Sequence, residues 1–188
     1  MINSVNQYFE DLEQGLQQFP KADLASMIEE IGKAYEQNRT IFVMGNGGSA
    51  STASHFAADL NKNVIPKGRR PRVIALTDNV EALTAWGNDS AYEDVFLEQL
   101  INFYNPGDVV VAISASGSSP NIIKAVEWAK EQGSLVIGLT GPKGAKLKSH
   151  SDVCVMAPTA PYELIEDFHV ICMHTMVTAL KEAYGGAQ

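Results

Sequence analysis

Five short apolar runs, rich in β-branched residues, recur along the 188 residues and are separated by segments of helical pattern. They read TIFVM, RVIAL, DVVVAIS, SLVIGLT and DVCVMA. Because the runs are continuously apolar rather than alternating, they are typical of parallel strands that are covered on both faces. The sequence therefore predicts one α/β domain, a five-stranded parallel sheet that is doubly wound in the flavodoxin-like manner and flanked by helices.

Apolar residues at helical spacing predict the helices. Two of them, over 3–19 and 22–37, precede the first run and are separated by Pro20. The others are expected over 49–62, 80–103 with a break near Gly87, 119–132, 143–149 and 162–183. We interpret residues 1–37 as an N-terminal helical hairpin. Residues 38–188 form the α/β domain in this interpretation.

The charge balance limits the partners of the chain. Fourteen basic side chains stand against 22 acidic ones, which gives a formal net charge of −8. Nucleic acids and anionic membranes require a basic footprint, so we expect no nucleic-acid partner and no membrane partner. The N-terminus lacks a basic start with an apolar stretch, and no apolar run approaches about 18 residues. The sequence therefore predicts a cytoplasmic protein.

Two turns rich in glycine and serine follow the first and third apolar runs. The first reads GNGGSAS from Gly45, and the second reads SASGSSPN from Ser114. Glycine lets a ligand approach the backbone amides, and the first-turn N–H groups of a helix attract anions. Ser119 and Pro120 also suit a helix start, a role that is compatible with anion binding. These turns favour a phosphorylated or hydroxyl-rich ligand, and their spacing fits neither a dinucleotide fingerprint nor a P-loop.

Histidines and carboxylates occur at helical spacing on two of the predicted helices. His55 and Asp59 are four residues apart, and Glu166 and His174 are eight apart, so each pair can share one side of its helix. Each feature alone fits an ordinary surface pair or a core histidine. Taken together, they can ligate a divalent metal such as zinc, or supply an acid and a base for proton transfer. The pattern leaves both possibilities open.

In these motifs the chain resembles the sugar isomerase (SIS) domain family and, within it, the phosphoheptose isomerases. The matching segments are GNGGSAS…HFAADL, WGNDSAYEDVF, AISASGSS and IGLTGPKGAKL, followed by the spacing E-x-x-H-x-x-x-x-H in the last helix. The resemblance covers essentially the whole chain, including the first two helices. The first and third segments are the specific ones, whereas the LTG segment is general to SIS domains.

The resemblance implies functional residues at matching positions. Substrate contacts are implied for Asn46, Gly47, Gly48, Ser49, Asn88, Asp89, Ser114, Ala115, Ser116, Ser119 and Glu166. The implied ligands of one zinc ion per subunit are His55, Asp59, Glu166 and His174. For catalysis it implies Asp59 as the base and His174 as the acid or base at the substrate oxygens, with Glu166 as a second carboxylate that can replace Asp59.

Three of these positions depart from the family pattern. Ala115 replaces a threonine, which removes one hydroxyl from the serine turn. Asp59 replaces a glutamate, so its carboxylate reaches less far by one methylene. Glu166 replaces a glutamine and adds a negative charge, and an anionic oxygen binds hard cations better than an amide oxygen does.

The implied activity is an aldose–ketose isomerisation through an enediol, which converts sedoheptulose 7-phosphate to D-glycero-D-manno-heptose 7-phosphate. The resemblance also implies a homotetramer with its sites at subunit interfaces. A role of residues 1–37 in this oligomerisation is consistent with their apolar faces, because one small domain hardly needs these faces for its own core. Two alternatives remain at this point. One is a non-catalytic SIS protein that binds a sugar phosphate or a partner protein, and the other is an isomerase for a different ketose phosphate.

Overall fold

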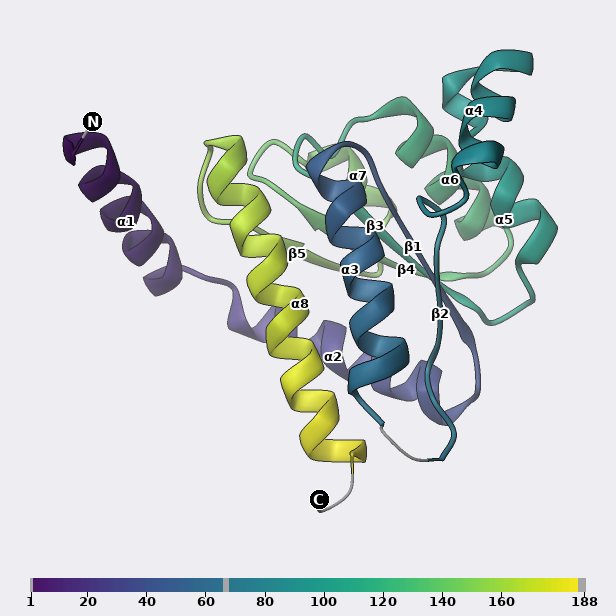
Figure 1. Cartoon of the computed structure of the whole chain (residues 1–188), viewed down its shortest axis with the longest axis horizontal. Coiled ribbons are helices and arrows are strands. Elements are labelled where there is room, and N and C mark those ends of the chain that lie inside the picture. The colour runs from purple at the N-terminus through teal and green to yellow at the C-terminus, as the bar shows by residue number, and fades with distance from the viewer. Residues whose placement is uncertain (1, 66–67, 186–188) are drawn as a thin grey trace.

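The computed structural model describes residues 2–65 and 68–185 and consists of one parallel sheet with helices on both of its faces (Figure 1). The strands are β1 (Thr40–Gly45), β2 (Arg72–Ala75), β3 (Val109–Ser114), β4 (Leu135–Thr140) and β5 (Val153–Met156). The helices are α1 (Ile2–Gln17), α2 (Lys21–Glu36), α3 (Gly48–Asn63), α4 (Val80–Asp89), α5 (Leu97–Phe103), α6 (Pro120–Glu131), α7 (Ala145–His150) and α8 (Tyr162–Tyr184), and a 3-10 turn spans Tyr92–Asp94. Within the described ranges, no helix is both long and apolar enough to cross a membrane.

The sheet has the order β2-β1-β3-β4-β5, and all of its pairings are parallel. This result confirms the predicted doubly wound fold. The chain leaves β1 toward one edge of the sheet and leaves β3 toward the other edge. The order therefore reverses between β1 and β3, where Gly45 is paired with Ile113. Ligands of open α/β sheets bind at such a reversal, beyond the carboxyl ends of the strands.

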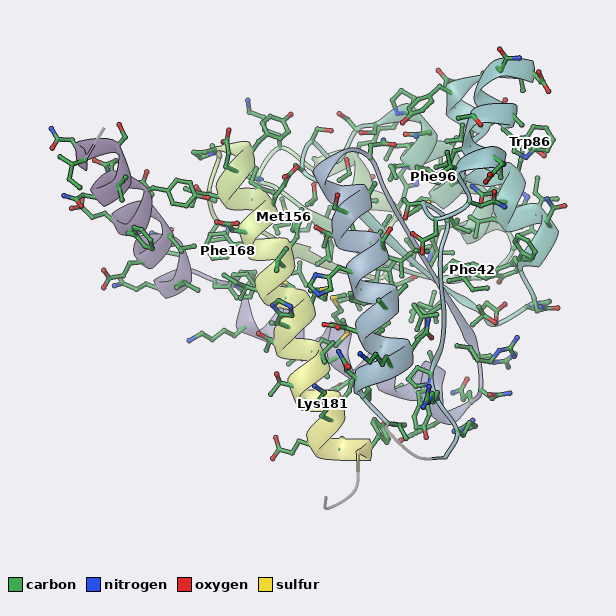
Figure 2. The ribbon with its side chains drawn as sticks, in the orientation of Figure 1. Phe42, Trp86, Phe96, Met156, Phe168 and Lys181 are labelled. Atoms are coloured by element: carbon green, nitrogen blue, oxygen red, sulfur yellow. The ribbon has the colours of Figure 1, made fainter. Side chains whose placement is uncertain are left out.

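Alternate residues of the three central strands, β1, β3 and β4, build two separate layers of core. On β1, Ile41 and Val43 face a cluster made with α2, α3 and α8, and Phe42 faces the opposite cluster, made with α5, α6 and α7. Figure 2 labels Phe42 and Phe96, which both belong to that second cluster. Because both faces of these central strands are buried, their successive residues are nearly all apolar, and this is the pattern that identified them in the sequence. The edge strand β2 is exposed on one face, at Arg72 and Ile74.

The two N-terminal helices have different positions. Helix α2 lies on the sheet and contributes Leu24, Met27 and Ile31 to the core, so the expectation that its apolar face is surplus to the domain is wrong. Helix α1 extends away from the body instead of folding back along α2 (Figure 1). Its C-terminal turn is held at Gly15, which lies directly against the ring of Phe168, a residue labelled in Figure 2.

The helical segment after β2 breaks later than the sequence predicted. Gly87 lies inside α4, and the break follows Asp89, at Ser90. The Ser90 hydroxyl donates to Oδ2 of Asp94 at 2.5 Å, and Lys124 of α6 forms an ion pair with Oδ1 of the same carboxylate. These contacts tie the turn to α6. The position of the break is thus decided by a tertiary contact rather than by the glycine.

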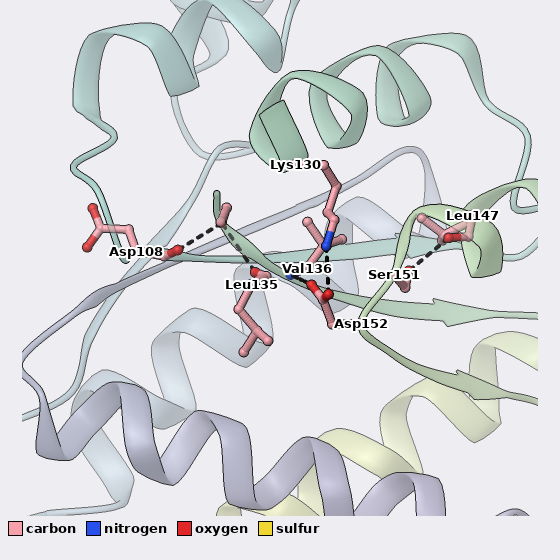
Figure 3. Close-up of polar contacts among 8 residues, drawn as sticks. Asp108, Lys130, Leu135, Val136, Leu147, Ser151 and Asp152 are labelled. Carbon is pink, nitrogen blue, oxygen red and sulfur yellow. Dashed lines mark hydrogen bonds and ion pairs between the residues drawn. The ribbon is translucent and has the colours of Figure 1, made fainter. Parts of the chain in front are cut away.

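Carboxylates hold the edge of the sheet where the strands begin, opposite the glycine- and serine-rich turns. Asp108 accepts the N–H of Thr40 at 2.8 Å and that of Asn105 at 2.9 Å. Asp152 accepts the N–H of Val136 at 2.8 Å and pairs with Lys130 at 2.6 Å (Figure 3). These bonds satisfy strand N–H groups that would otherwise be buried without a partner, so they fix where β1 and β4 begin.

Asp108→Ala should lower the free energy of unfolding by about 2 kcal/mol, because it leaves the buried N–H of Thr40 without an acceptor. Urea denaturation followed by circular dichroism measures this loss. Asp108→Asn is the matched control, since its amide oxygen can still accept one of the two bonds and the loss should be smaller. Equal losses in the two variants would contradict the assigned role of the carboxylate.

Candidate active site

The turn after β1 places backbone N–H groups at the carboxyl edge of the sheet. Gly47 adopts a φ of +55°, a left-handed conformation that favours glycine, and it precedes the first turn of α3. The first N–H groups of an α-helix have no partners within the helix and carry its partial positive charge. Ser49, which is 4% exposed, adds a hydroxyl within this first turn.

The turn after β3 gathers hydroxyl groups at the start of α6. The Ser114 hydroxyl oxygen lies 3.5 Å from that of Ser116 and 3.4 Å from that of Ser119, and it accepts the N–H of Gly117 at 3.1 Å. Ser119 directly precedes Pro120, the first residue of α6. Three hydroxyls and a helix N-terminus therefore face one small region, as the phosphate of a ligand requires.

The two turns line one cleft of about 110 Å³. Its walls come from both turns and from the start of α8, and the lining residues are Asn46, Ser49, Ile113, Ser114, Ala115, Ser116, Ser119, Tyr162 and Glu166. A second cavity of about 300 Å³ adjoins it and shares Ala115, Ser116 and Tyr162. Lys143 is the only basic side chain among the residues that line these two cavities. The predicted convergence of the two turns is thus present within a single chain.

Helices α3 and α8 bring two histidines to one carboxylate. Nε2 of His55 lies 3.5 Å from Oδ2 of Asp59, and Nε2 of His174 lies 3.9 Å from the same oxygen. The imidazole rings meet edge to face with their centroids 5.2 Å apart. The other oxygen of Asp59 accepts from Nδ2 of Asn63 at 2.6 Å. We call His55, Asp59 and His174 the histidine–aspartate cluster.

The histidine–aspartate cluster fits a divalent metal ion in its donor set and its spacing. All three side chains offer a ligand atom within 4.8 Å of the others. Zinc takes imidazole nitrogens and carboxylate oxygens at about 2 Å, so the ligand atoms around one ion lie roughly 3–4 Å apart. The distances from Oδ2 of Asp59 agree with that geometry. Three protein ligands also leave one coordination position open, as in catalytic zinc sites.

Glu166, the fourth predicted ligand, lies elsewhere. Its carboxylate stands directly over Gly48, where a Cβ atom would collide with it, and it lines the cleft with the serine turn. It is not part of the histidine–aspartate cluster among the described residues. The structure therefore places Glu166 with the predicted substrate contacts and separates it from the other three predicted ligands.

Asn88 and Asp89 are not brought to the cleft. They lie at the exposed C-terminal end of α4, Asn88 donates to Oδ1 of Asp89 at 2.7 Å, and neither lines either of the two cavities. Instead, Tyr92 of the following turn reaches the site, and its hydroxyl donates to Oδ1 of Asn46 at 3.0 Å.

Besides Tyr92 and Tyr162, the sequence analysis did not name three further residues near the site. Asn121 forms hydrogen bonds with Asn46, Asn63 holds Asp59, and Lys143 lines the second cavity. Asn63 follows Asp59 by four residues, so helical spacing alone could have indicated that contact. The other two depend on contacts between separate segments, which no local pattern reveals.

His169, the third histidine on these helices, belongs to the core. Its side chain is 1% exposed, and burial lowers its pKa to about 4, so the imidazole is neutral at pH 7. It does not line the cleft or join the histidine–aspartate cluster. Its position on α8 therefore reflects packing.

Comparisons with known proteins agree with this fold. The family model of the SIS domain matches residues 7–141, so the chain is a sugar isomerase (SIS) domain protein. A phosphoheptose isomerase of Rhodospirillum rubrum is 38% identical over 143 residues, which are 76% of each chain. Phosphoheptose isomerase 1 of Campylobacter jejuni is 33% identical over 186 residues, 98% of this chain and 100% of that protein.

The likeness extends to a solved structure. The phosphoheptose isomerase of Neisseria gonorrhoeae has a TM-score of 0.88 and 32% identity, with 96% of this chain and 98% of that one covered. The chain thus belongs, within the SIS domain family, to the phosphoheptose isomerases. The resemblance inferred from the sequence motifs is confirmed.

Gly48→Ala should weaken anion binding, because the new Cβ would push the Glu166 carboxylate from its position and narrow the cleft. We expect the dissociation constant for inorganic phosphate, measured by isothermal titration calorimetry, to rise about tenfold. Gly87→Ala is the control, since a Cβ there would have its closest contact at 3.7 Å, from Val95, and should leave the constant unchanged. An unchanged constant in Gly48→Ala would contradict the tight approach of the two groups.

Proposed function

We propose that the chain is an aldose–ketose isomerase that converts sedoheptulose 7-phosphate to D-glycero-D-manno-heptose 7-phosphate. The observation that carries this proposal is the separation between the cleft and the histidine–aspartate cluster along the same two helices. The cleft suits the phosphate group, and the cluster suits proton transfer at the other end of the sugar.

We assign the phosphate group of the substrate to the cleft because of the groups that line it. Ser114, Ser116 and Ser119 offer hydroxyls, and the starts of α3 and α6 offer N–H groups and positive helix ends. In our proposal these groups bind the anion, although no arginine is among the residues that line the two cavities. Lys143, in the adjoining cavity, adds a positive charge nearby.

The length of a seven-carbon sugar matches the distance to the histidine–aspartate cluster. His55 follows Ser49 by six positions on α3, and His174 follows Glu166 by eight positions on α8. At 1.5 Å per residue these intervals rise about 9 Å and about 12 Å. In an extended ketoheptose 7-phosphate, C2 lies roughly 9 Å from phosphorus, given C–C bonds of about 1.5 Å. With the phosphate in the cleft, C1 and C2 therefore reach the histidine–aspartate cluster.

The reaction needs one base at carbon and one group that moves protons among oxygens. In our proposal Asp59 removes a proton from C1 while the carbonyl oxygen on C2 gains one, which gives the enediol. Return of a proton to C2 and loss of the proton on O1 then yield the aldehyde. Nε2 of His174 is next to Asp59, so we assign it the transfers at oxygen. Glu166 lies at the phosphate end, which makes it the weaker candidate for the base.

We propose zinc as the cofactor, with His55, Asp59 and His174 as its ligands. A bound cation would polarise the carbonyl and stabilise negative charge on the enediolate oxygens. Asp59 and His174 would then each have two competing roles, because a carboxylate oxygen or an imidazole nitrogen that ligates a cation is a weaker base. Asn63 holds the second oxygen of Asp59 and limits how the side chain can turn between these roles.

Exposed apolar residues support assembly of several copies, and we propose a homotetramer with sites near the interfaces. Helix α1 carries Ile2, Val5 and Phe9, whose exposed fractions are 69%, 50% and 65%. Such a row is unusual on a helix that contacts only its own chain. A cytoplasmic location follows in this proposal from the activity on a phosphorylated sugar.

A panel of ketose phosphates with five to seven carbons, followed by NMR, tests the function. We expect the fastest turnover with sedoheptulose 7-phosphate, since shorter sugars held by the same phosphate site would stop short of the histidine–aspartate cluster. Asp59→Asn should lower kcat at least about a hundredfold with little change in the dissociation constant for phosphate. Glu166→Gln is the matched carboxylate-to-amide control and should retain turnover.

Other outcomes of this experiment have clear meanings. Faster turnover of a five- or six-carbon ketose phosphate would assign the chain to a different isomerisation. Binding of phosphate without turnover of any sugar would favour a non-catalytic binding protein. Loss of turnover in Glu166→Gln together with full activity in Asp59→Asn would transfer the role of the base to Glu166.

For zinc, we expect about one ion per chain in protein purified without chelator, measured by elemental analysis. His55→Ala should lose it, because it removes one of three ligands. His150→Ala is the control, since that histidine lies 3.4 Å from Glu127 and outside the histidine–aspartate cluster. Equal zinc content in the two variants would exclude this site.

A further inference from the structure

We infer that Asn121 is a positioning residue, which holds Asn46 in one orientation and fixes the spacing between the two turns of the cleft. This inference deepens the proposed function, because it concerns recognition of the anionic end of the same ligand. It rests on a pair of amide side chains that links the turn after β1 to the first turn of α6.

The two amides bond to each other in both directions. Nδ2 of Asn46 donates to Oδ1 of Asn121 at 2.9 Å, and Nδ2 of Asn121 donates to Oδ1 of Asn46 at 2.9 Å. Each amide is therefore both donor and acceptor to the other, so neither can rotate without breaking two hydrogen bonds. The residues are 75 positions apart in the chain.

Asn121 is well suited to hold its partner. It is 1% exposed, and its Oδ1 also accepts the N–H of Ile122 at 3.0 Å. The Asn121 side chain is therefore held by the backbone of α6 in addition to its contacts with Asn46. A buried side chain that makes three hydrogen bonds gives a rigid support.

The pairing decides what Asn46 can offer to a ligand. A side-chain amide has two N–H donors and an oxygen that can accept two hydrogen bonds. Oδ1 of Asn46 already accepts from Asn121 and from the hydroxyl of Tyr92, so its capacity is used. One N–H of Asn46 bonds to Asn121, and the other is left for the cleft that Asn46 lines. Asn46 is thereby set as a hydrogen-bond donor, which suits the oxygens of a phosphoryl group.

Helix α6 supports Asn46 from both sides. Asn121 belongs to its first turn, and Lys124, one turn later, pairs with Asp94 in the segment that carries Tyr92. The donor from Tyr92 and the amide of Asn121 are thus placed by the same helix. If Asn121 were absent, Asn46 could rotate and present its oxygen to the anion, which would repel it.

Asn121→Ala should raise the dissociation constant for inorganic phosphate, measured by calorimetry, about tenfold. The KM for the sugar phosphate should rise in parallel, while kcat changes less than about threefold, because the catalytic end of the site is untouched. Asn46→Ala should show a similar effect. The double variant should be no worse than either single variant, since Asn121 acts through Asn46.

Asn61→Ala is the matched control. The Asn61 side chain also makes two hydrogen bonds, to the N–H and C=O of Val73, and it lies beside β2 away from the cleft. It should lower stability but leave phosphate affinity unchanged. Asn121→Ser covers the case in which Asn121→Ala fails to fold, because it keeps an uncharged polar group at this buried position but cannot form the amide pair with Asn46, and its phosphate affinity should fall as well.

Unchanged phosphate affinity in both Asn121 variants would overturn the inference, and so would additive effects in the double variant. The binding measurement is independent of turnover. If the chain bound phosphate but isomerised no sugar, the proposed function would fail while the role of Asn121 would be decided by the affinities alone.

Discussion

The pairing of β1 with β3 is the constraint on which the rest of the structure depends. These two parallel strands lie side by side although α3, β2, α4 and α5 separate them in the chain. Their carboxyl ends meet at Gly45 and Ile113, so both turns, and the helices that follow them, begin at one place. The Asn46–Asn121 pair closes the contact between the turns. The hydroxyls, the backbone N–H groups and the helix ends then act on a single ligand group.

In the proposed function, this arrangement lets an acidic chain bind an anion. The formal net charge is −8, and Glu166 adds a carboxylate beside the cleft. The attraction therefore comes from local dipoles and hydroxyls, which act over a few ångströms, rather than from the overall charge. In addition, the anion site is separated along α3 and α8 from the histidine–aspartate cluster. Binding and proton transfer can then be altered independently by substitution.

Much of the fold could be predicted from the sequence because burial on both faces left a clear signal in the three central strands. The five apolar runs and the two glycine- and serine-rich turns were found in this way, and the structure confirms the strands and their parallel order. The break at Ser90 was predicted near Gly87 instead, because a glycine is tolerated inside a helix when tertiary contacts favour the helix. The role of α2 was also missed, since an apolar helical face does not indicate which surface covers it.

The sequence by itself determined the chemistry that was available: the hydroxyls of the serine turn, the glycines of the first turn, and the histidines and carboxylates at helical spacing. Spacing along one helix also determined that His55 and Asp59 are neighbours. Only the tertiary structure decided that His174 joins them, that Glu166 lies over Gly48 at the other end of the site, and that Asn121 holds Asn46. The physical reason is that hydrogen bonds and ion pairs between distant segments depend on strand order and helix packing, which local periodicity does not encode.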